Sequence, residues 1–369
     1  MRFINCSYET FLQKLNNRKI VQFGASSAWE YFASSFPDIG REVVDKTLCV
    51  VDNSPDKQGS FFDICGRKII VEAPDILERL SDYVILIIVS VQYQEKICQQ
   101  LEEMGLPMDT ECYSLPLMLL SFDEADNSAV DEYFRNRKNG LIPSKIHSFW
   151  FSGEEKPDLY KRCIESWYRY CPEFEIIEWN AENYDVTQNR YMLEAFENRK
   201  WAFVSDFARL DVIYRYGGVY LDMDVELVAP LAPYLRADAF FCRQEDGMLE
   251  LGSGFGARAE NSLVGEALDS YKDRRLIKPD GSLDKMAQPE MLNPIFIRNG
   301  FHKSHDSQIV AECIVFSNDY ITCYAGTDSV ANAKLGIHWH NGGWLEENDR
   351  NNIQGAIEAR EPLLKKYFR

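Results

Sequence analysis

The stretch YGGVYLDMD, residues 216–224, decides the fold of the second half of the chain. Its two glycines end a helix, and the apolar run 219–221 predicts a short buried strand. Asp222 and Asp224 follow two positions apart, where a loop can turn both carboxylates toward one cation. Carboxylate oxygens suit Mg²⁺ and Mn²⁺, which keep coordination positions open for phosphate oxygens. The stretch therefore predicts a divalent-metal site, although a solvated strand end would show the same spacing.

A helix is predicted directly before this strand, because residues 203–214 repeat apolar side chains at helical spacing. Ser205 is expected to cap its first turn. Asp206 and Arg209 are three positions apart and share one face near the helix start. Two interpretations fit this pair. It is either a surface ion pair of small energetic weight, or a pair held beside the metal loop to bind sugar hydroxyls.

Residues 205–226, SDFARLDVIYRYGGVYLDMDVE, resemble the core motif of glycosyltransferase family 32, a sugar-transfer family with a DXD motif. Upstream, IPSKIHSFWFSG at 142–153 is similar to the family's opening strand. Downstream, GIHWHNGGW at 336–344 is similar to its closing motif. The resemblance covers about residues 142–345. It implies an α/β fold of the GT-A type, a nucleotide-binding sandwich.

The resemblance also implies a reaction. The protein would move a hexose from a UDP- or GDP-hexose to a saccharide, which we expect to be lipid-linked and to serve capsule or surface polysaccharide synthesis. Mn²⁺ or Mg²⁺ would bind the DXD residues, and the anomeric configuration would be retained. Retention can arise by double displacement or by same-face attack, and the sequence offers no nucleophile that would decide between them.

Individual side chains receive roles from the same resemblance. Asp224 would ligate the metal directly, while Asp222 would hold the ribose and the water shell of the metal. Asp206 and Arg209 would hold the donor sugar, and Arg209 would offset charge on the leaving diphosphate. The other implied contacts are base stacking by Trp150, a ribose pocket lined by Tyr220, metal ligation by His338 and closure over the diphosphate by Trp344.

The sequence departs from the family pattern at two positions. Gly343 precedes Trp344 where the family usually has serine, and Ser253 stands where it often has asparagine. Both departures concern the contacts to diphosphate and acceptor, and neither affects the two aspartates of the DXD motif.

Ordinary interpretations stay open for several of these residues. Trp150 lies in an apolar stretch and could be a core side chain. His340 shares a strand face with His338 and is the weaker metal-ligand candidate of the two. Asp284 could line the acceptor cleft or simply belong to a loop.

The first third of the chain shows a different pattern, in which short β-branched runs alternate with helical stretches. The predicted strands are 19–23, 47–51 and 83–90, and the predicted helices are 28–36 and 94–104. Such alternation is typical of βαβ units and a doubly wound sheet. We therefore predict a Rossmann-like α/β domain at 1–120, a charged linker at 121–141 and a catalytic domain at 142–369.

The sequence of the loop after the first predicted strand bears on whether this domain binds a dinucleotide. Gly24 stands where a phosphate loop begins, and Asp52 follows at about the ribose-binding distance. Only one of the three fingerprint glycines is present, so close approach of a pyrophosphate is not secured. A structural or docking role is the favoured interpretation.

Charge and composition argue against several classes of protein. The net charge of -18, from 58 acidic and 40 basic residues, argues against nucleic-acid binding and against adhesion to an anionic membrane except through a local basic patch. The longest apolar run, 83–91, is too short to span a bilayer. Ten cysteines without a CxxC pair indicate a reducing compartment. We expect a cytoplasmic protein, at most peripheral at the inner membrane face.

Two other classes compete with sugar transfer. VYLDMDVELV superficially resembles the haloacid-dehalogenase motif, in which Asp222 would be the nucleophile of a phosphohydrolase. That motif requires Thr or Val where this chain has Glu226. The second alternative is a non-catalytic nucleotide- or sugar-binding protein.

Overall fold

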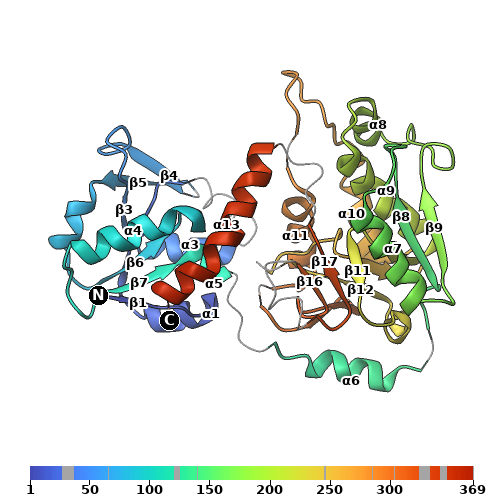
Figure 1. The fold of residues 1–369 in the computed structure, drawn as a ribbon, viewed down its shortest axis with the longest axis horizontal. Helices are drawn as coiled ribbons and strands as arrows, with labels where there is room; N and C mark the ends of the chain where they lie inside the picture. The colour runs from blue at the N-terminus through green and yellow to red at the C-terminus, as the bar shows by residue number, and fades with distance from the viewer. Residues whose placement is uncertain are drawn as a thin grey trace. The chain divides into compact units, whose positions relative to one another are not determined.

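The chain forms two compact units, Met1–Asp123 with Glu346–Arg369, and Glu124–Leu345 (Figure 1). The computed structural model describes residues 1–26, 37–64, 66–119, 125–138, 140–244, 247–284, 286–302, 304–323, 333–340 and 347–368. No helix among these residues has the length and apolar content needed to cross a bilayer. The α/β class expected from the sequence is confirmed, because both units are built on sheets covered by helices.

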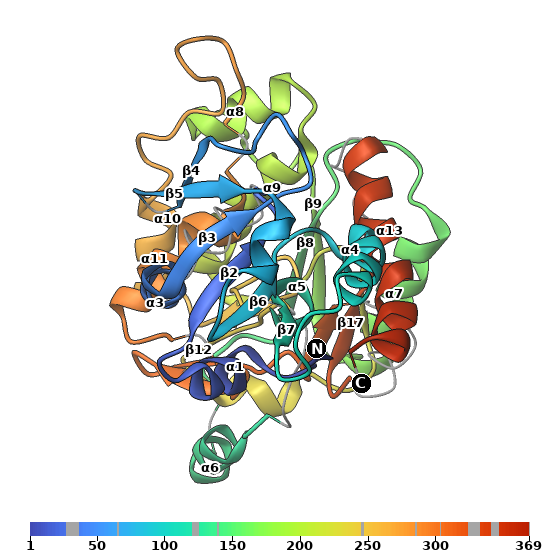
Figure 2. The same cartoon turned by 90° about the vertical axis from the view of Figure 1, so that its left-hand side faces the viewer.

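A mostly parallel sheet of seven strands forms the centre of the first unit, as Figure 2 shows. Its order is β1 (Arg2–Phe3), β7 (Glu111–Ser114), β6 (Tyr83–Ile87), β2 (Lys19–Phe23), β3 (Thr47–Val51), β5 (Arg67–Glu72) and β4 (Phe61–Ile64). Only β4 pairs antiparallel, with β5. Every residue of β6 is buried, as its continuous apolar sequence predicts for a strand covered on both faces.

The helical elements of this unit are α1 (Tyr8–Leu15), α3 (Pro37–Lys46), η1 (Pro74–Glu78), α4 (Val91–Glu103), α5 (Leu115–Leu119) and α13 (Glu347–Lys366). Helix α4 corresponds to the helix predicted at 94–104 and begins three residues earlier. The helix predicted at 28–36 lies outside the described residues.

The loop after β2 is shaped by close packing. Gly24 has φ +110, and a Cβ there would lie 2.4 Å from Cγ1 of Val89. The Asp52 carboxylate accepts hydrogen bonds from Ala25 N (2.9 Å) and Lys57 Nζ (3.1 Å). Burial alone would raise the pKa of Asp52, but these bonds and one from Ser54 N lower it overall. Asp52 thus fastens the loop after β2, and dinucleotide binding there stays untested.

A mixed sheet of seven strands forms the second unit. Its order is β14 (Gln308–Val310), β15 (Cys313–Val315), β12 (Ala239–Phe241), β13 (Phe255–Ala257), β10 (Gly218–Tyr220), β8 (Lys145–Phe149) and β9 (Glu175–Trp179). β10 runs parallel to β8 and antiparallel to β13. A smaller sheet has the order β11 (Val225–Leu227), β17 (Gly336–His338) and β16 (Ile321–Cys323).

The helical elements of the second unit are α6 (Ser128–Asn136), α7 (Asp158–Tyr170), α8 (Arg190–Glu197), α9 (Trp201–Tyr216), η2 (Ala232–Arg236), α10 (Ser262–Asp269) and α11 (Gln288–Arg298). Trp167 of α7 is 1% exposed and donates from Nε1 to Val225 O at 2.8 Å, so α7 fixes β11. The central strand β10 ends at Tyr220, which places the predicted aspartates at the carboxyl edge of the sheet.

Two predicted boundaries differ from the structure. The predicted catalytic domain extended to residue 369, but α13 packs against α4 in the first unit. Tyr367 and Phe368 are buried there and meet Phe3 edge-on. In turn, α6 lies in the predicted linker but belongs to the second unit, in which Phe134 is buried. Helical periodicity identifies an apolar face and does not reveal which of two cores covers it.

Phe368→Ala tests this assignment. Since Phe368 is 2% exposed in the core of the first unit, we expect the free energy of unfolding of that unit to fall by about 3–5 kcal/mol. Phe61→Ala, at a side chain that is 66% exposed in the same unit, is the matched control and should change it by less than about 0.5 kcal/mol. Urea-dependent hydrogen exchange of β6 and α4 amides would measure both, and equal effects would contradict the assignment.

Candidate active site

A two-glycine turn joins α9 to β10 and sets the position of the site. Gly217 (φ +64) and Gly218 (φ +113) both adopt left-handed conformations that favour glycine. A Cβ on Gly218 would lie 2.9 Å from Nε2 of His147. His147 is buried, accepts from Trp179 Nε1 (3.0 Å) and lies 3.0 Å from Gly217 O. Burial lowers its pKa to about 4, so the neutral ring donates its remaining N–H to the turn.

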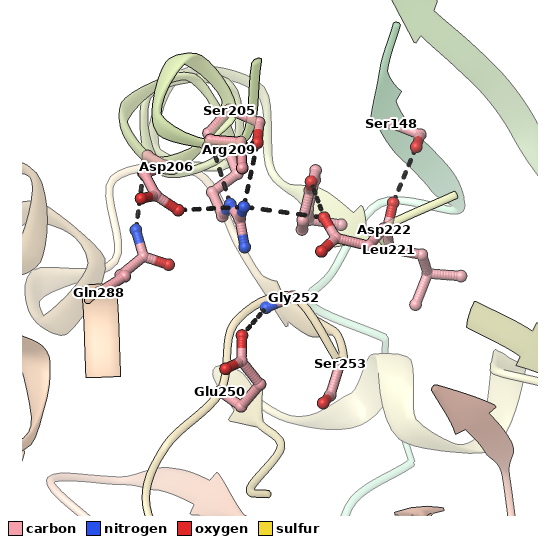
Figure 3. Close-up of polar contacts among 12 residues, drawn as sticks. Ser148, Ser205, Asp206, Arg209, Leu221, Asp222, Glu250, Gly252, Ser253 and Gln288 are labelled. Carbon is pink, nitrogen blue, oxygen red and sulfur yellow. Dashed lines mark hydrogen bonds and ion pairs between the residues drawn. The ribbon is translucent and has the colours of Figure 1, made fainter. Parts of the chain in front are cut away.

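The buried Arg209 connects the helix to the strand (Figure 3). Its Nη2 lies 3.1 Å from Asp206 Oδ1 and 3.7 Å from Asp222 Oδ1. Nε and Nη2 also donate to Ser205 O and Oγ, each at 3.1 Å. The guanidinium lies 4.9 Å from the ring centroid of Tyr220, whose hydroxyl donates to Asp222.

Two expectations about this helix are wrong. Arg209 has a side chain only 5% exposed, so the surface ion-pair interpretation of Asp206 and Arg209 fails. Ser205 does not cap the helix either, because α9 begins at Trp201 and Ser205 lies inside it. Its hydroxyl instead accepts a hydrogen bond from Arg209, so the residue predicted as a helix cap orients the guanidinium group of the site.

Asp222, Asp224 and His338 form the group of possible metal ligands in the described part of the chain. One ligand atom from each lies within 4.8 Å of the others. His338 reaches Asp224 because β17 pairs with β11, and the Nε2 to Oδ1 distance is 3.3 Å. Nδ1 of His338 lies 2.9 Å from Ser253 Oγ, which orients the ring. Two carboxylates and one imidazole fit Mn²⁺ or Mg²⁺.

The loop that carries this group is fixed by backbone hydrogen bonds. Asp222 N donates to Gly252 O (3.2 Å), and Trp339 N donates to Asp224 O (3.0 Å). Val225 N closes the turn onto Asp222 O at 3.0 Å. The spacing of the two aspartates is therefore set by the strands on both sides of the loop rather than by solvent.

Glu250 is an acidic residue of this site that sequence reasoning missed. Its Oε1 accepts from Gly252 N at 2.8 Å, close to Arg209 and Asp222 (Figure 3). Burial raises its pKa. Burial also raises the pKa of Asp206 to about 6, with Glu250 and Asp222 adding to the rise and Arg209 opposing it. Burial is the main cause of both raised pKa values, and the Asp222 carboxylate adds to each of them.

The structure excludes a fully buried core position for Trp150 and places Asp284 in a loop. Trp150 follows β8, so it shares the carboxyl edge with the DXD loop. The side chain is half-buried, and Nε1 donates to Glu154 O at 2.7 Å. Asp284 forms an ion pair from this loop, with 3.0 Å between its Oδ2 and Nε of Arg274. Base stacking by Trp150 and an acceptor contact by Asp284 stay predictions.

The remaining predicted residues are distributed as follows. Tyr220 is 1% exposed and faces Asp222, and its ribose contact stays a prediction. The ring centroid of His340 lies 3.9 Å from that of His338, but His340 is not in the ligand group. Trp344 and Gly343 lie outside the described residues. The structure thus brings together Asp206, Arg209, Tyr220, Asp222, Asp224 and His338, and their individual roles stay predictions.

Comparison with known proteins agrees with this geometry. The family model for the glycosyltransferase sugar-binding region containing the DXD motif matches residues 157–241. Mannosyl phosphorylinositol ceramide synthase of Saccharomyces cerevisiae is 30% identical over 136 residues, which cover 35% of this chain and 35% of that protein. Inositol phosphoceramide mannosyltransferase 1 of Schizosaccharomyces pombe is 23% identical over 275 residues, covering 69% of this chain and 79% of that protein.

Among solved structures, the PaToxG glycosyltransferase overlaps 46% of this chain and 74% of its own, with 13% identity and a TM-score of 0.34, too low to establish a shared fold. The match to the family model includes α9 and the DXD loop, where the site residues meet. Residues 157–241 are therefore similar to the DXD-containing sugar-binding region of glycosyltransferases, and the chain spans about a third of the length of the Saccharomyces cerevisiae relative it matches.

Proposed function

We propose that this protein transfers a hexose, with retention of configuration, from a UDP- or GDP-hexose to a saccharide acceptor. The observation that carries the proposal is the meeting of Asp222, Asp224 and His338 with the buried Arg209. When bound there, Mn²⁺ or Mg²⁺ would offset the charge of the diphosphate. Retention rests on the family resemblance alone.

Individual side chains would bind the donor sugar and stabilise the leaving diphosphate. Arg209 is held by Ser205 and Asp206, so its charge is oriented before the donor arrives. It would stabilise charge that develops on the leaving diphosphate. The Asp206 carboxylate would accept hydrogen bonds from sugar hydroxyls. Tyr220 keeps Asp222 turned toward this region through its hydroxyl.

We propose a lipid-linked acceptor because the fungal relatives are named for transfer of mannose to inositol phosphoceramide, a phosphorylated lipid. Capsule or surface polysaccharide synthesis, a cytoplasmic location and peripheral contact with the inner membrane face belong to the same proposal.

The alternatives have less support. A dehalogenase-type nucleophile needs a free carboxylate, whereas Asp222 receives the Tyr220 hydroxyl and faces Arg209. A non-catalytic binding protein would hold a nucleotide sugar without consuming it. Measurement of turnover separates this case from a transferase.

The test is release of nucleoside diphosphate from a panel of UDP- and GDP-hexoses, with and without Mn²⁺. We expect slow hydrolysis of one donor, loss of release with chelator and recovery when Mn²⁺ is returned, because the ligand group needs a cation to offset its carboxylates. Vesicles with an inositol phospholipid or a lipid-linked saccharide supply the acceptor arm. Release of inorganic phosphate from phosphomonoesters would favour the hydrolase, and metal-dependent donor binding without turnover would favour the binding protein.

A further inference from the structure

Three side chains of the site converge on one glycine. A Cβ on Gly252 would lie 2.6 Å from Asp222 Oδ2, 2.8 Å from Glu250 Oε1 and 3.4 Å from Arg209 Nη1. No φ in the left-handed range requires glycine here. Position 252 is therefore a glycine because a side chain has no room there. Its methyl group would enter the volume that these polar groups border.

Two of the groups border this space with atoms that can take a further hydrogen bond, Nη1 of Arg209 and Oε1 of Glu250. Arg209 uses Nε and Nη2 for its contacts, and within the described part of the chain Nη1 has no hydrogen-bond partner although the side chain is 5% exposed. Oε1 of Glu250 accepts from Gly252 N, and Oε2 has no partner among the same residues. Figure 3 shows Nη1 directed toward the side of the site where Glu250 lies. A cationic donor that is directed into this space and makes no hydrogen bond with the described residues can bind an acceptor atom of a ligand.

Glu250 is not part of the metal group. The described acidic, histidine and cysteine side chains that gather within ligand distance are Asp222, Asp224 and His338. The Glu250 carboxylate thus lies beside the possible metal site, on the side of Arg209. A cation at the DXD loop would leave Oε2 available to another ligand.

We propose that Glu250 is a further contact to the transferred sugar, beside Nη1 of Arg209, and that it makes the pocket specific for a sugar with a hydroxyl at this position. The inference rests on the proposed function and deepens it. A sugar hydroxyl beside Gly252 can accept from Nη1 of Arg209 and donate to the Glu250 carboxylate at once. Asp206 would hold a different hydroxyl, because its carboxylate pairs with Nη2 of Arg209 and not with Nη1.

Calorimetry and turnover of Glu250→Gln and Glu250→Ala test this role. We expect the affinity for the accepted nucleotide sugar to fall about 10- to 100-fold in Glu250→Ala, as for loss of a hydrogen bond to a charged group, with a smaller fall in Glu250→Gln. The affinities for Mn²⁺ and for the bare nucleoside diphosphate should fall much less than the affinity for the nucleotide sugar, because Glu250 is outside the group of possible metal ligands. Glu312→Gln, at an acid whose side chain is 81% exposed, is the control.

Each outcome bears on a specific statement. Equal donor affinity and turnover in wild type and Glu250→Gln would overturn the role of Glu250 and leave the proposed function intact. A parallel loss of affinity for Mn²⁺, nucleoside diphosphate and nucleotide sugar would also overturn it, because that pattern indicates a structural role. Absence of nucleotide-sugar binding by the wild type would overturn the proposed function, and the inference with it.

Discussion

Replacing Arg209 with lysine is expected to lower donor turnover by about 100- to 1,000-fold, although the charge is kept. Arg209 makes contacts through Nε and Nη2 and directs Nη1 into the site, which requires a planar group with several donors. Lysine has one compact ammonium group and cannot bind Ser205, Asp206 and a ligand in these directions. The negative charges of Asp206 and Asp222 would then be less well neutralised.

The matched control is Arg215→Lys on the same helix. Arg215 pairs with Asp211 one turn away and its side chain is 42% exposed, so substitution should change turnover less than about twofold. Nucleoside diphosphate release at saturating Mn²⁺ measures both variants, and circular dichroism verifies that they fold. Similar activity of Arg209→Lys and Arg215→Lys would show that Arg209 only contributes charge or packing.

Gly252→Ala is expected to lower turnover about 100-fold with the fold retained, because the added methyl must displace Asp222 or Glu250. A carbon 2.6 Å from Asp222 Oδ2 cannot be accommodated without movement, and a shift of about 1 Å at a metal ligand is enough for such a loss. Side-chain movement at the edge of the site should cost no more than about 1–3 kcal/mol of stability.

Gly140→Ala provides the comparison for this substitution. The Cβ there would meet only Leu235 O at 3.7 Å, an ordinary contact. Turnover and the midpoint of thermal unfolding should both stay close to wild type. If Gly252→Ala were as active as Gly140→Ala, the space above Gly252 would have no role in donor binding.

The local part of the site could be predicted from the sequence. Asp222 and Asp224 follow a strand, and Asp206 and Arg209 share a helix face, so short-range periodicity places each pair. His338 was found through the family resemblance, and β17 does bring it to Asp224. Spacing and motifs can both be read from a single sequence, so these residues could be identified from it.

Glu250 and His147 could not be predicted in the same way. Glu250 reaches the site because β13 pairs antiparallel with β10, and no local pattern marks that pairing. His147 supports the glycine turn from a neighbouring strand about 70 positions earlier in the chain. A partial signal was present in Gly252 and Gly254, since glycines within an apolar stretch often mark close approach of other groups.

The path of the chain has a consequence for biosynthesis. Residues 124–345 form an insertion between two segments of one unit, and α13 supplies the last part of that unit's core. During vectorial synthesis the inserted unit can therefore complete its own core on the ribosome while the unit that precedes it is still incomplete. The apolar surface that later receives Tyr367 and Phe368 stays uncovered until then and would be a natural binding site for a chaperone.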